Sequence, residues 1–123
     1  MTINKNHLSE EEIEVTQNCG TEPPFSGKLL YEKREGIYKC IVCNNKLFKS
    51  EAKFESGTGW PSFYDAIGDT VISKEDNSFG MKRMEINCKN CNSHLGHIFS
   101  DGPTPTGLRY CVNSLSLGFD PVE

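Results

Sequence analysis

Two Cys-x-x-Cys pairs, Cys40/Cys43 and Cys88/Cys91, constrain the fold of this chain more than any other feature of its sequence. In a sequence without a recognisable export signal, such paired motifs are typical of a metal site rather than of a disulfide framework. Four thiolates suit a closed tetrahedral zinc site, which leaves no position open for a substrate. We therefore predict one structural Zn²⁺ ion. Iron, which accepts the same ligands, is the weaker alternative.

The separation of the two pairs indicates where the metal lies in the fold. A redox-active dithiol is the alternative for either pair alone, but no βαβ pattern surrounds them and the second pair repeats the first. The distance along the chain from Cys43 to Cys88 is more than twice the roughly 15–20 residues of a compact zinc ribbon. The metal is therefore expected to link two distant hairpin turns of a larger β structure.

Short strand-like segments separated by turn signals make up most of the remaining sequence. Strands are expected at residues 37–40, 46–48, 70–73 and 81–87, with a polar turn at 75–78. Ser9 and Glu12 form a capping-box pattern, which predicts a short helix within residues 8–17. The pattern predicts a mainly β fold with one helical piece. We expect a single domain over residues 1–123, with residues 1–7 as a frayed tail.

Length and charge narrow the possible functions. A chain of 123 residues can bury a core without needing disulfides. Its 13 Lys and Arg residues against 17 Asp and Glu residues give a net charge of −4, which disfavours nucleic-acid binding. The apolar runs are too short to cross a membrane, and the N-terminus lacks a signal-peptide pattern. We expect a cytoplasmic monomer that binds neither nucleic acid nor membrane.

Cys111, near the C-terminus, lies outside both metal pairs. Because side chains alternate along a strand, Arg109, Cys111 and Asn113 would project from one face. Tyr110 and Val112 would point to the other face, toward the core. A neighbouring cation favours the thiolate, the reactive form of cysteine. Taken alone, this stretch leaves open the alternative that Cys111 is one more small buried apolar residue.

Two histidines, His94 and His97, precede Cys111 in the sequence. Residues three apart face opposite ways on a regular strand, but a bulge at Gly96 would bring both to one face. Facing Cys111 across paired strands, they would supply proton donors that work near neutral pH beside a reactive thiol. The alternative for either histidine is that it caps the zinc turn.

Trp60 is the only tryptophan and lies in a loop broken by Gly57 and Gly59. A lone tryptophan is equally well explained as a core residue. The flanking glycines and the following Pro61 nevertheless place it on a loop, where binding residues are commonly found.

These motifs together resemble the methionine-R-sulfoxide reductases of type B. Besides both Cys-x-x-Cys pairs, the resemblance rests on residues 20–25, 56–63, 94–99, 101–103 and 109–114. It extends from about Leu8 to Phe119, and motifs in this order are highly specific. It implies two small antiparallel sheets around an active site, with a structural zinc at a distance.

The resemblance also implies a reaction. Cys111 would attack the sulfur of methionine-R-sulfoxide, most plausibly in a protein or peptide, while His97 or His94 protonates the oxygen. Methionine would leave, and Cys111 would remain as a sulfenic acid, which condenses readily with a second thiol. Selectivity for the R epimer is implied by the family alone.

Five further residues receive roles from the same resemblance. Trp60 and Phe99 would form an aromatic pocket for the S-methyl group, because sulfur packs well against aromatic rings. Asn113 and Arg109 would orient and polarise the reacting groups. Asp101 would hold a histidine through its second ring nitrogen.

The sequence departs from the family pattern at Thr58, where many members carry the resolving cysteine. Cys19, the one other cysteine outside the metal pairs, would then resolve the sulfenic acid as a Cys19–Cys111 disulfide that thioredoxin reduces. The alternative is that Cys19 is incidental and the reductant attacks Cys111 directly.

The competing function is a non-catalytic zinc-containing β module that binds another protein, since fold alone does not determine function. A module of that kind would not require Cys111, Asn113, His97 and Trp60 together. Their joint presence favours the enzyme.

Overall fold

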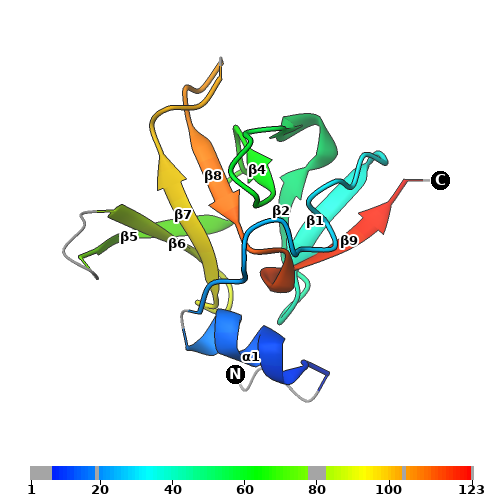
Figure 1. Ribbon diagram of the computed structural model, residues 1–123, viewed down its shortest axis with the longest axis vertical. Helices are drawn as coiled ribbons and strands as arrows, with labels where there is room; N and C mark the ends of the chain where they lie inside the picture. Colours follow the sequence, from blue (N-terminus) through cyan, green and yellow to red (C-terminus); the bar gives the residue numbers. More distant parts are fainter. Residues whose placement is uncertain (1–6, 19, 78–82, 104, 123) are drawn as a thin grey trace.

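The computed structural model describes residues 7–18, 20–77, 83–103 and 105–122, and two antiparallel sheets with one α-helix form most of it (Figure 1). The elements in chain order are α1 (Glu10–Gln17), β1 (Gly36–Cys40), β2 (Lys46–Lys49), η1 (Ser50–Ala52), β3 (Lys53–Phe54), β4 (Ser62–Phe63), β5 (Val71–Asp76), β6 (Arg83–Cys88), β7 (His94–Phe99), β8 (Arg109–Val112), η3 (Ser114–Ser116) and β9 (Leu117–Pro121). The predicted fold of two antiparallel sheets with a short helix is confirmed.

The two sheets differ in size and lie side by side in Figure 1. The smaller sheet has the strand order β2-β1-β9, so the last strand of the chain pairs with the first. The larger sheet has the order β3-β4-β8-β7-β6-β5, in which β5 to β8 follow one another as a meander. The strand that carries Cys111, β8, is therefore an inner strand of the larger sheet, between β4 and β7.

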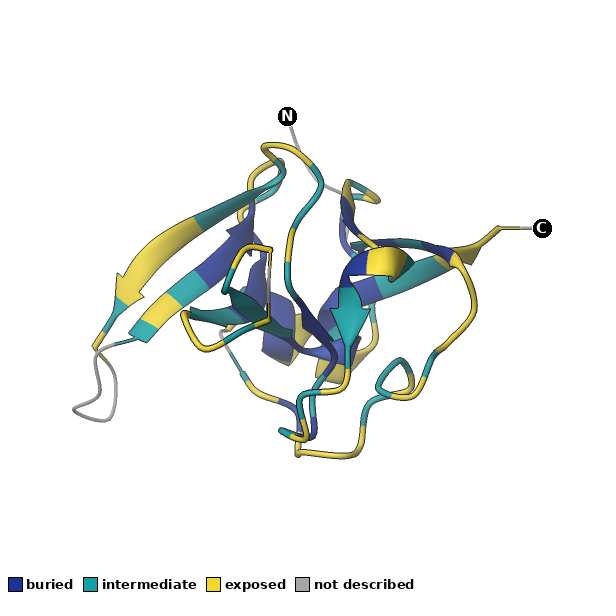
Figure 2. Cartoon of the chain, turned by 90° about the horizontal axis from the view of Figure 1, so that it is seen from above, coloured by how far each residue is buried: buried dark blue, intermediate teal, exposed yellow. Residues whose placement is uncertain are grey.

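Aromatic rings from both sheets form the centre of the core. Tyr38 on β1 and Phe63 on β4 are fully buried, and their ring centroids lie 5.0 Å apart in an edge-on arrangement. Phe48 on β2 stacks on Phe63 at 4.3 Å. Such pairs add to the free energy gained from apolar burial. Figure 2 shows the buried segments gathered in the middle of the molecule, between the sheets.

Helix α1 begins with the predicted capping box. The backbone N–H of Glu12 donates to Ser9 Oγ at 3.1 Å, and the backbone N–H of Ser9 donates to Glu12 Oε1 at 2.8 Å. Val15 and Thr16 are buried where the helix packs against β7 and η3. No helix in the described part of the chain is long and apolar enough to cross a membrane.

The hairpin of β5 and β6 differs from the prediction at its tip. The polar turn expected at residues 75–78 begins later, because Glu75 and Asp76 are still part of β5 and pair with Met84 and Arg83. Asp76 is stabilised in the strand by contacts across the sheet, including an ion pair with Arg83 at 3.5 Å. Residues 78–82, which include the remainder of that turn and the predicted start of the second strand, lie outside the described residues.

Candidate active site

Each Cys-x-x-Cys pair occupies a tight turn between two paired strands, and the two turns have the same hydrogen bonds. The carbonyl of Cys40 accepts from the N–H of Asn44 at 2.8 Å, and the carbonyl of Cys88 accepts from the N–H of Asn92 at 2.7 Å. Asn44 and Asn92 both adopt the left-handed conformation, with φ of 67° and 64°. Asparagine tolerates this conformation better than most residues, so each turn is favoured by its own sequence.

The four cysteine sulfur atoms of these turns come together between the sheets. Cys40 Sγ lies 3.6 Å from Cys91 Sγ, Cys43 Sγ lies 3.6 Å from Cys88 Sγ, and all four lie within 4.8 Å of one another. A tetrahedral ion bound by thiolates at roughly 2.3 Å separates its sulfur ligands by about 3.8 Å. The cluster therefore fits a single metal ion, which would link β1 of one sheet to β6 of the other.

A separate cavity of about 280 Å³ opens beside strands β7 and β8. It is lined by Thr21, Thr58, Trp60, Arg83, Gly96, His97, Phe99, Arg109, Cys111 and Asn113. None of the four clustered cysteines is in this lining, so the fifth described cysteine, Cys111, belongs to a different site. Six of the residues that the sequence predicts for the site meet here: Trp60, His97, Phe99, Arg109, Cys111 and Asn113.

Strand β8 presents Cys111 as its alternation predicts. Arg109, Cys111 and Asn113 all line the cavity, while Val112 between them is fully buried in the core. Cys111 lies directly opposite His97 in the pairing of β7 with β8. Side chains opposite each other on antiparallel strands have Cβ atoms about 4.5–5.5 Å apart. The thiol and the imidazole therefore share one small space.

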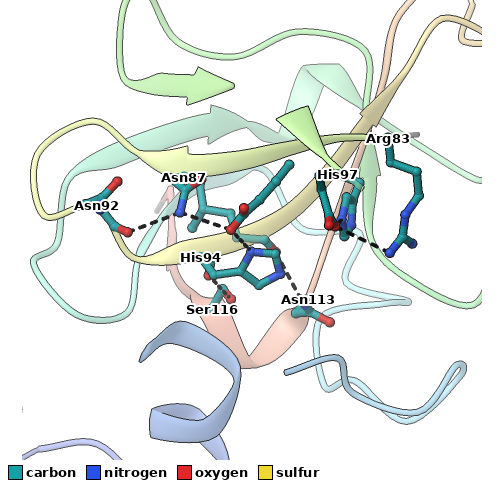
Figure 3. A network of polar contacts seen from close by, with 10 residues as sticks. Arg83, Asn87, Asn92, His94, His97, Asn113 and Ser116 are labelled. Atoms are coloured by element: carbon teal, nitrogen blue, oxygen red, sulfur yellow. Dashed lines mark hydrogen bonds and ion pairs between the residues drawn. The ribbon is translucent and has the colours of Figure 1, made fainter. Parts of the chain in front are cut away.

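The predicted irregularity near Gly96 is present. In the pairing of β6 with β7, Ile86 faces Gly96 and Asn87 faces His94, which leaves Leu95 as the extra residue of a bulge. The bulge turns His94 and His97 toward the same side, with ring centroids 5.7 Å apart (Figure 3). Gly96 is required for a second reason, because a Cβ there would lie 2.0 Å from the Cys111 carbonyl oxygen.

The two histidines have different surroundings. His97 lines the cavity, and its Nε2 donates to Asp76 Oδ2 at 2.8 Å. His94 is 3 % exposed and is not in the cavity lining; its Nδ1 donates to Glu85 Oε2 at 2.7 Å. Burial lowers the pKa of His94 despite the neighbouring Glu85 carboxylate. Of the two proposed proton donors, His97 alone reaches the cavity. His94 Nδ1 donates to Glu85, so the alternative that His94 caps the metal turn through Nδ1 does not fit.

Opposing effects act on the pKa of Cys111, and the larger of them is not the one that the sequence predicts. Burial raises the pKa of the Cys111 thiol above its ordinary value. Thr58, whose Oγ1 lies 3.8 Å from Cys111 Sγ, and the positive charge of Arg109 both act in the opposite direction. Arg109 thus favours the thiolate as predicted, but burial has the larger effect.

Asp101 contacts Arg109 rather than a histidine, which corrects the role predicted for it. Arg109 Nε donates to Asp101 Oδ1 at 2.8 Å, and Arg109 Nη2 donates to Asp101 Oδ2 at 3.2 Å. The guanidinium also lies 4.3 Å from the centre of the Phe99 ring. The carboxylates that do hold the histidines are Asp76 on β5 and Glu85 on β6. The sequence predicts a turn at Asp76 and a strand at Glu85, and it gives neither residue a place at the site.

The loop at residues 20–25 lines the cavity with Thr21, and the next residue, Glu22, contacts two of the other lining residues. The sequence predicted no individual role for Glu22. Trp60 Nε1 donates to the Glu22 carbonyl at 2.9 Å, and the Glu22 N–H donates to Asn113 Oδ1 at 3.1 Å. The Glu22 side chain is 2 % exposed and accepts from the Leu115 N–H at 2.9 Å, and burial raises its pKa. One residue therefore orients both Trp60 and Asn113. The signal available in the sequence was its position within the 20–25 motif.

Trp60 is half-buried in the cavity wall, so the loop-site interpretation of the lone tryptophan fits better than the core one. Thr58, the residue at which the sequence departs from the pattern that it resembles, lies beside Cys111. The predicted alternative, Cys19, lies outside the described residues.

The chain is similar to known proteins over nearly its whole length. Residues 8–121 match the SelR domain family. The chain is 58 % identical over 120 residues to the peptide methionine sulfoxide reductase MsrB of Methanosarcina mazei, a match that covers 97 % of this chain and 86 % of that protein. It is 57 % identical over 120 residues to MsrB of Escherichia coli K12, with 97 % and 88 % covered.

A solved structure of the Mis18 "Yippee-like" domain is similar in fold alone, with a TM-score of 0.59 and 17 % identity; the match covers 73 % of this chain and 99 % of that one.

The MsrB relatives, matched over nearly their full length, confirm the resemblance inferred from the motifs. The chain belongs to the SelR-domain family of MsrB-type peptide methionine sulfoxide reductases.

Proposed function

We propose that this protein reduces methionine-R-sulfoxide, within proteins or peptides, to methionine, with Cys111 as the nucleophile. The observation that carries the proposal is the pairing of Cys111 with His97 in a cavity lined by Trp60 and Asn113. We further propose that the protein acts as a monomer in the cytoplasm.

In the proposed reaction, the Cys111 thiolate attacks the sulfoxide sulfur while His97 transfers a proton to the sulfoxide oxygen. The attack forms a bond between the two sulfur atoms. The hydroxyl group then passes from the methionine sulfur to Cys111 as this S–S bond and the original S–O bond break, so methionine leaves and Cys111 remains as a sulfenic acid. Trp60 and Phe99 would hold the S-methyl group against their rings. Asp76 accepts from His97 Nε2 and would stabilise the ring when it is protonated.

Asn113 and Arg109 would orient the reacting groups. Asn113 is fixed at both ends of its amide, because Oδ1 accepts from the Glu22 N–H and Nδ2 donates to the Leu95 carbonyl at 3.2 Å. Arg109 would polarise the site and favour the thiolate, with Asp101 holding its guanidinium. His94, which is buried beside Glu85, would support the position of His97 rather than donate the proton itself.

The four clustered cysteines would bind one structural Zn²⁺. Four thiolates around a closed site favour zinc over metals that prefer oxygen ligands, with iron as the alternative. The ion would supply folding free energy, and the reaction steps above need none of its chemistry.

The test of the function is turnover of the separated sulfoxide epimers with dithiothreitol as the only reductant. The R epimer of an N-acetylated methionine sulfoxide should be converted to methionine, and the S epimer should remain. A protein with its metal bound that reduces neither epimer would instead support the non-catalytic binding module.

Cys19→Ser is expected to separate the two routes by which Cys111 is regenerated. If Cys19 resolves the sulfenic acid, the variant should still release one methionine per protein, but steady turnover with thioredoxin should fall at least about tenfold. A disulfide requires Cα atoms within roughly 7 Å, so this route also requires that distance to be reached during the reaction. Unchanged thioredoxin-driven turnover would show that the reductant attacks Cys111 directly.

The pH dependence of Cys111 alkylation should follow its surroundings. Because burial raises the Cys111 pKa, alkylation by iodoacetamide should continue to accelerate at pH values above the ordinary range of a cysteine thiol. Arg109→Gln should move this rise to higher pH, because the cation that favours the thiolate is lost. Asp101→Asn, the matched control, should move it slightly to lower pH. Mass spectrometry of the Cys111 peptide gives the rates, and a downward shift in Arg109→Gln would contradict the assignment.

A further inference from the structure

A second, apolar groove of about 210 Å³ lies next to the cavity that contains Cys111. Phe25, Leu30, Tyr31 and Phe54 contribute to its walls, and Trp60 lines both the groove and the Cys111 cavity. The two hollows therefore meet at one side chain. Anything that fills the cavity against Trp60 continues naturally into the groove.

The groove is also where exposed aromatic side chains gather. Among the described residues, the exposed large apolar side chains are Ile13, Phe25, Tyr31, Met84 and Val122. The two aromatic ones, Phe25 and Tyr31, are 60 % and 64 % exposed, and both line this groove. Exposed aromatic residues that cluster beside an active site are typical of a surface that binds a partner chain.

The backbone at Phe25 is held in a conformation that a bulky residue rarely adopts. Its φ is 64°, in the left-handed region, and its N–H donates to the Gly59 carbonyl at 2.7 Å. A Cβ at Gly59 would lie 3.1 Å from the Phe25 ring carbons, so the ring packs directly on that glycine, next to Trp60. Backbone strain of this kind persists where the surrounding structure enforces it, commonly at ligand-binding sites. A ring that stays mostly exposed gives little core packing in return.

We propose that this groove binds an apolar or aromatic side chain adjacent to the methionine sulfoxide in a polypeptide substrate. The inference rests on the proposed function and extends it to substrate choice. Consecutive Cα atoms of a peptide are 3.8 Å apart, so a side chain next to the sulfoxide residue falls within reach of a groove that begins at Trp60. The protein would then prefer sulfoxides flanked by apolar or aromatic residues over sulfoxides flanked by polar residues.

The test compares short peptides that carry methionine-R-sulfoxide flanked on both sides by phenylalanine or by serine, with dithiothreitol as reductant. The natural protein should show kcat/KM about tenfold higher for the phenylalanine peptide, the low end of what apolar pocket contacts provide. Phe25→Gly and Tyr31→Ser should each remove most of this preference, mainly through KM. Turnover of free methionine sulfoxide should not change.

The choice of glycine at position 25 separates binding from folding. Glycine adopts positive φ without strain, so Phe25→Gly should keep the melting temperature of the natural protein while losing the peptide preference. Ile13→Gln, at an exposed apolar residue on α1, is the matched control and should keep the preference in full.

Three outcomes would overturn the inference. Equal kcat/KM for both peptides in the natural protein would show that the groove makes no contact with substrate. An effect of Phe25→Gly confined to thioredoxin-driven turnover would assign the groove to the reductant instead. A protein that reduces no sulfoxide at all would overturn the proposed function as well, whereas reduction without any flanking preference overturns this inference alone.

Discussion

Replacing Cys111 with serine should abolish sulfoxide reduction, lowering kcat/KM by roughly a thousandfold or more, because the hydroxyl is a far weaker nucleophile than a thiolate. The fold should be unaffected. Serine is close in size to cysteine, and the distance from the thiol to Thr58 Oγ1, 3.8 Å, leaves room for the hydroxyl. Turnover of the R epimer and the melting temperature, measured on the same preparation, check both halves of this prediction.

Metal content is the control for Cys111→Ser. The variant should retain one equivalent of metal, because the four clustered sulfur atoms do not include that of Cys111. Stoichiometric loss of metal would mean that Cys111 is a ligand, and the assignment of Cys111 as the nucleophile would fail.

Cys88→Ser should lower the stability of the fold, whereas Cys111→Ser should abolish the reaction and leave the fold intact. Cys88 is fully buried at the end of β6, and its sulfur lies 3.6 Å from that of Cys43 in the turn of the other sheet. Binding free energies of structural zinc are roughly 10–16 kcal/mol in small zinc domains, and most of that is folding free energy. Losing one ligand should therefore lower the melting temperature by at least about 10 °C and release the metal.

Cys111→Ser is the matched control for this prediction too, because it removes a partly buried thiol outside the cluster. Metal release is measured by a colorimetric chelator during thermal unfolding. A Cys88→Ser protein that binds no metal yet melts at the temperature of the natural protein would show that the cluster has no structural role.

Local sequence patterns predicted the parts of the site that depend on a single strand or turn. The alternation of Arg109, Cys111 and Asn113 is a property of β8 and of the extended residue that follows it. The bulge beside Gly96 was predicted from two histidines at a spacing that a regular strand cannot place on one face. The two metal turns repeat the same five-residue pattern, Cys-x-x-Cys-Asn, and therefore the same backbone geometry.

What the sequence could not predict depends on which strands pair and in which register. Asp76 reaches His97 because β5 continues through it and pairs with β6, whereas its sequence neighbours are typical of a turn. The resemblance implied a histidine partner for Asp101, and the local sequence gives no sign of Arg109, which becomes its neighbour only after the chain turns back. The direction of the Cys111 pKa shift depends on burial of the thiol, and a local charge count does not include burial.

The most direct test of the central claim is the state of Cys111 after a single turnover. The fully reduced protein is mixed with one equivalent of methionine-R-sulfoxide without any reductant, quenched with a thiol alkylating reagent, and analysed by peptide mass. The account predicts one methionine released per protein and a Cys111 peptide protected from alkylation, with no protection by the S epimer. Methionine release with Cys111 still fully alkylated would contradict it.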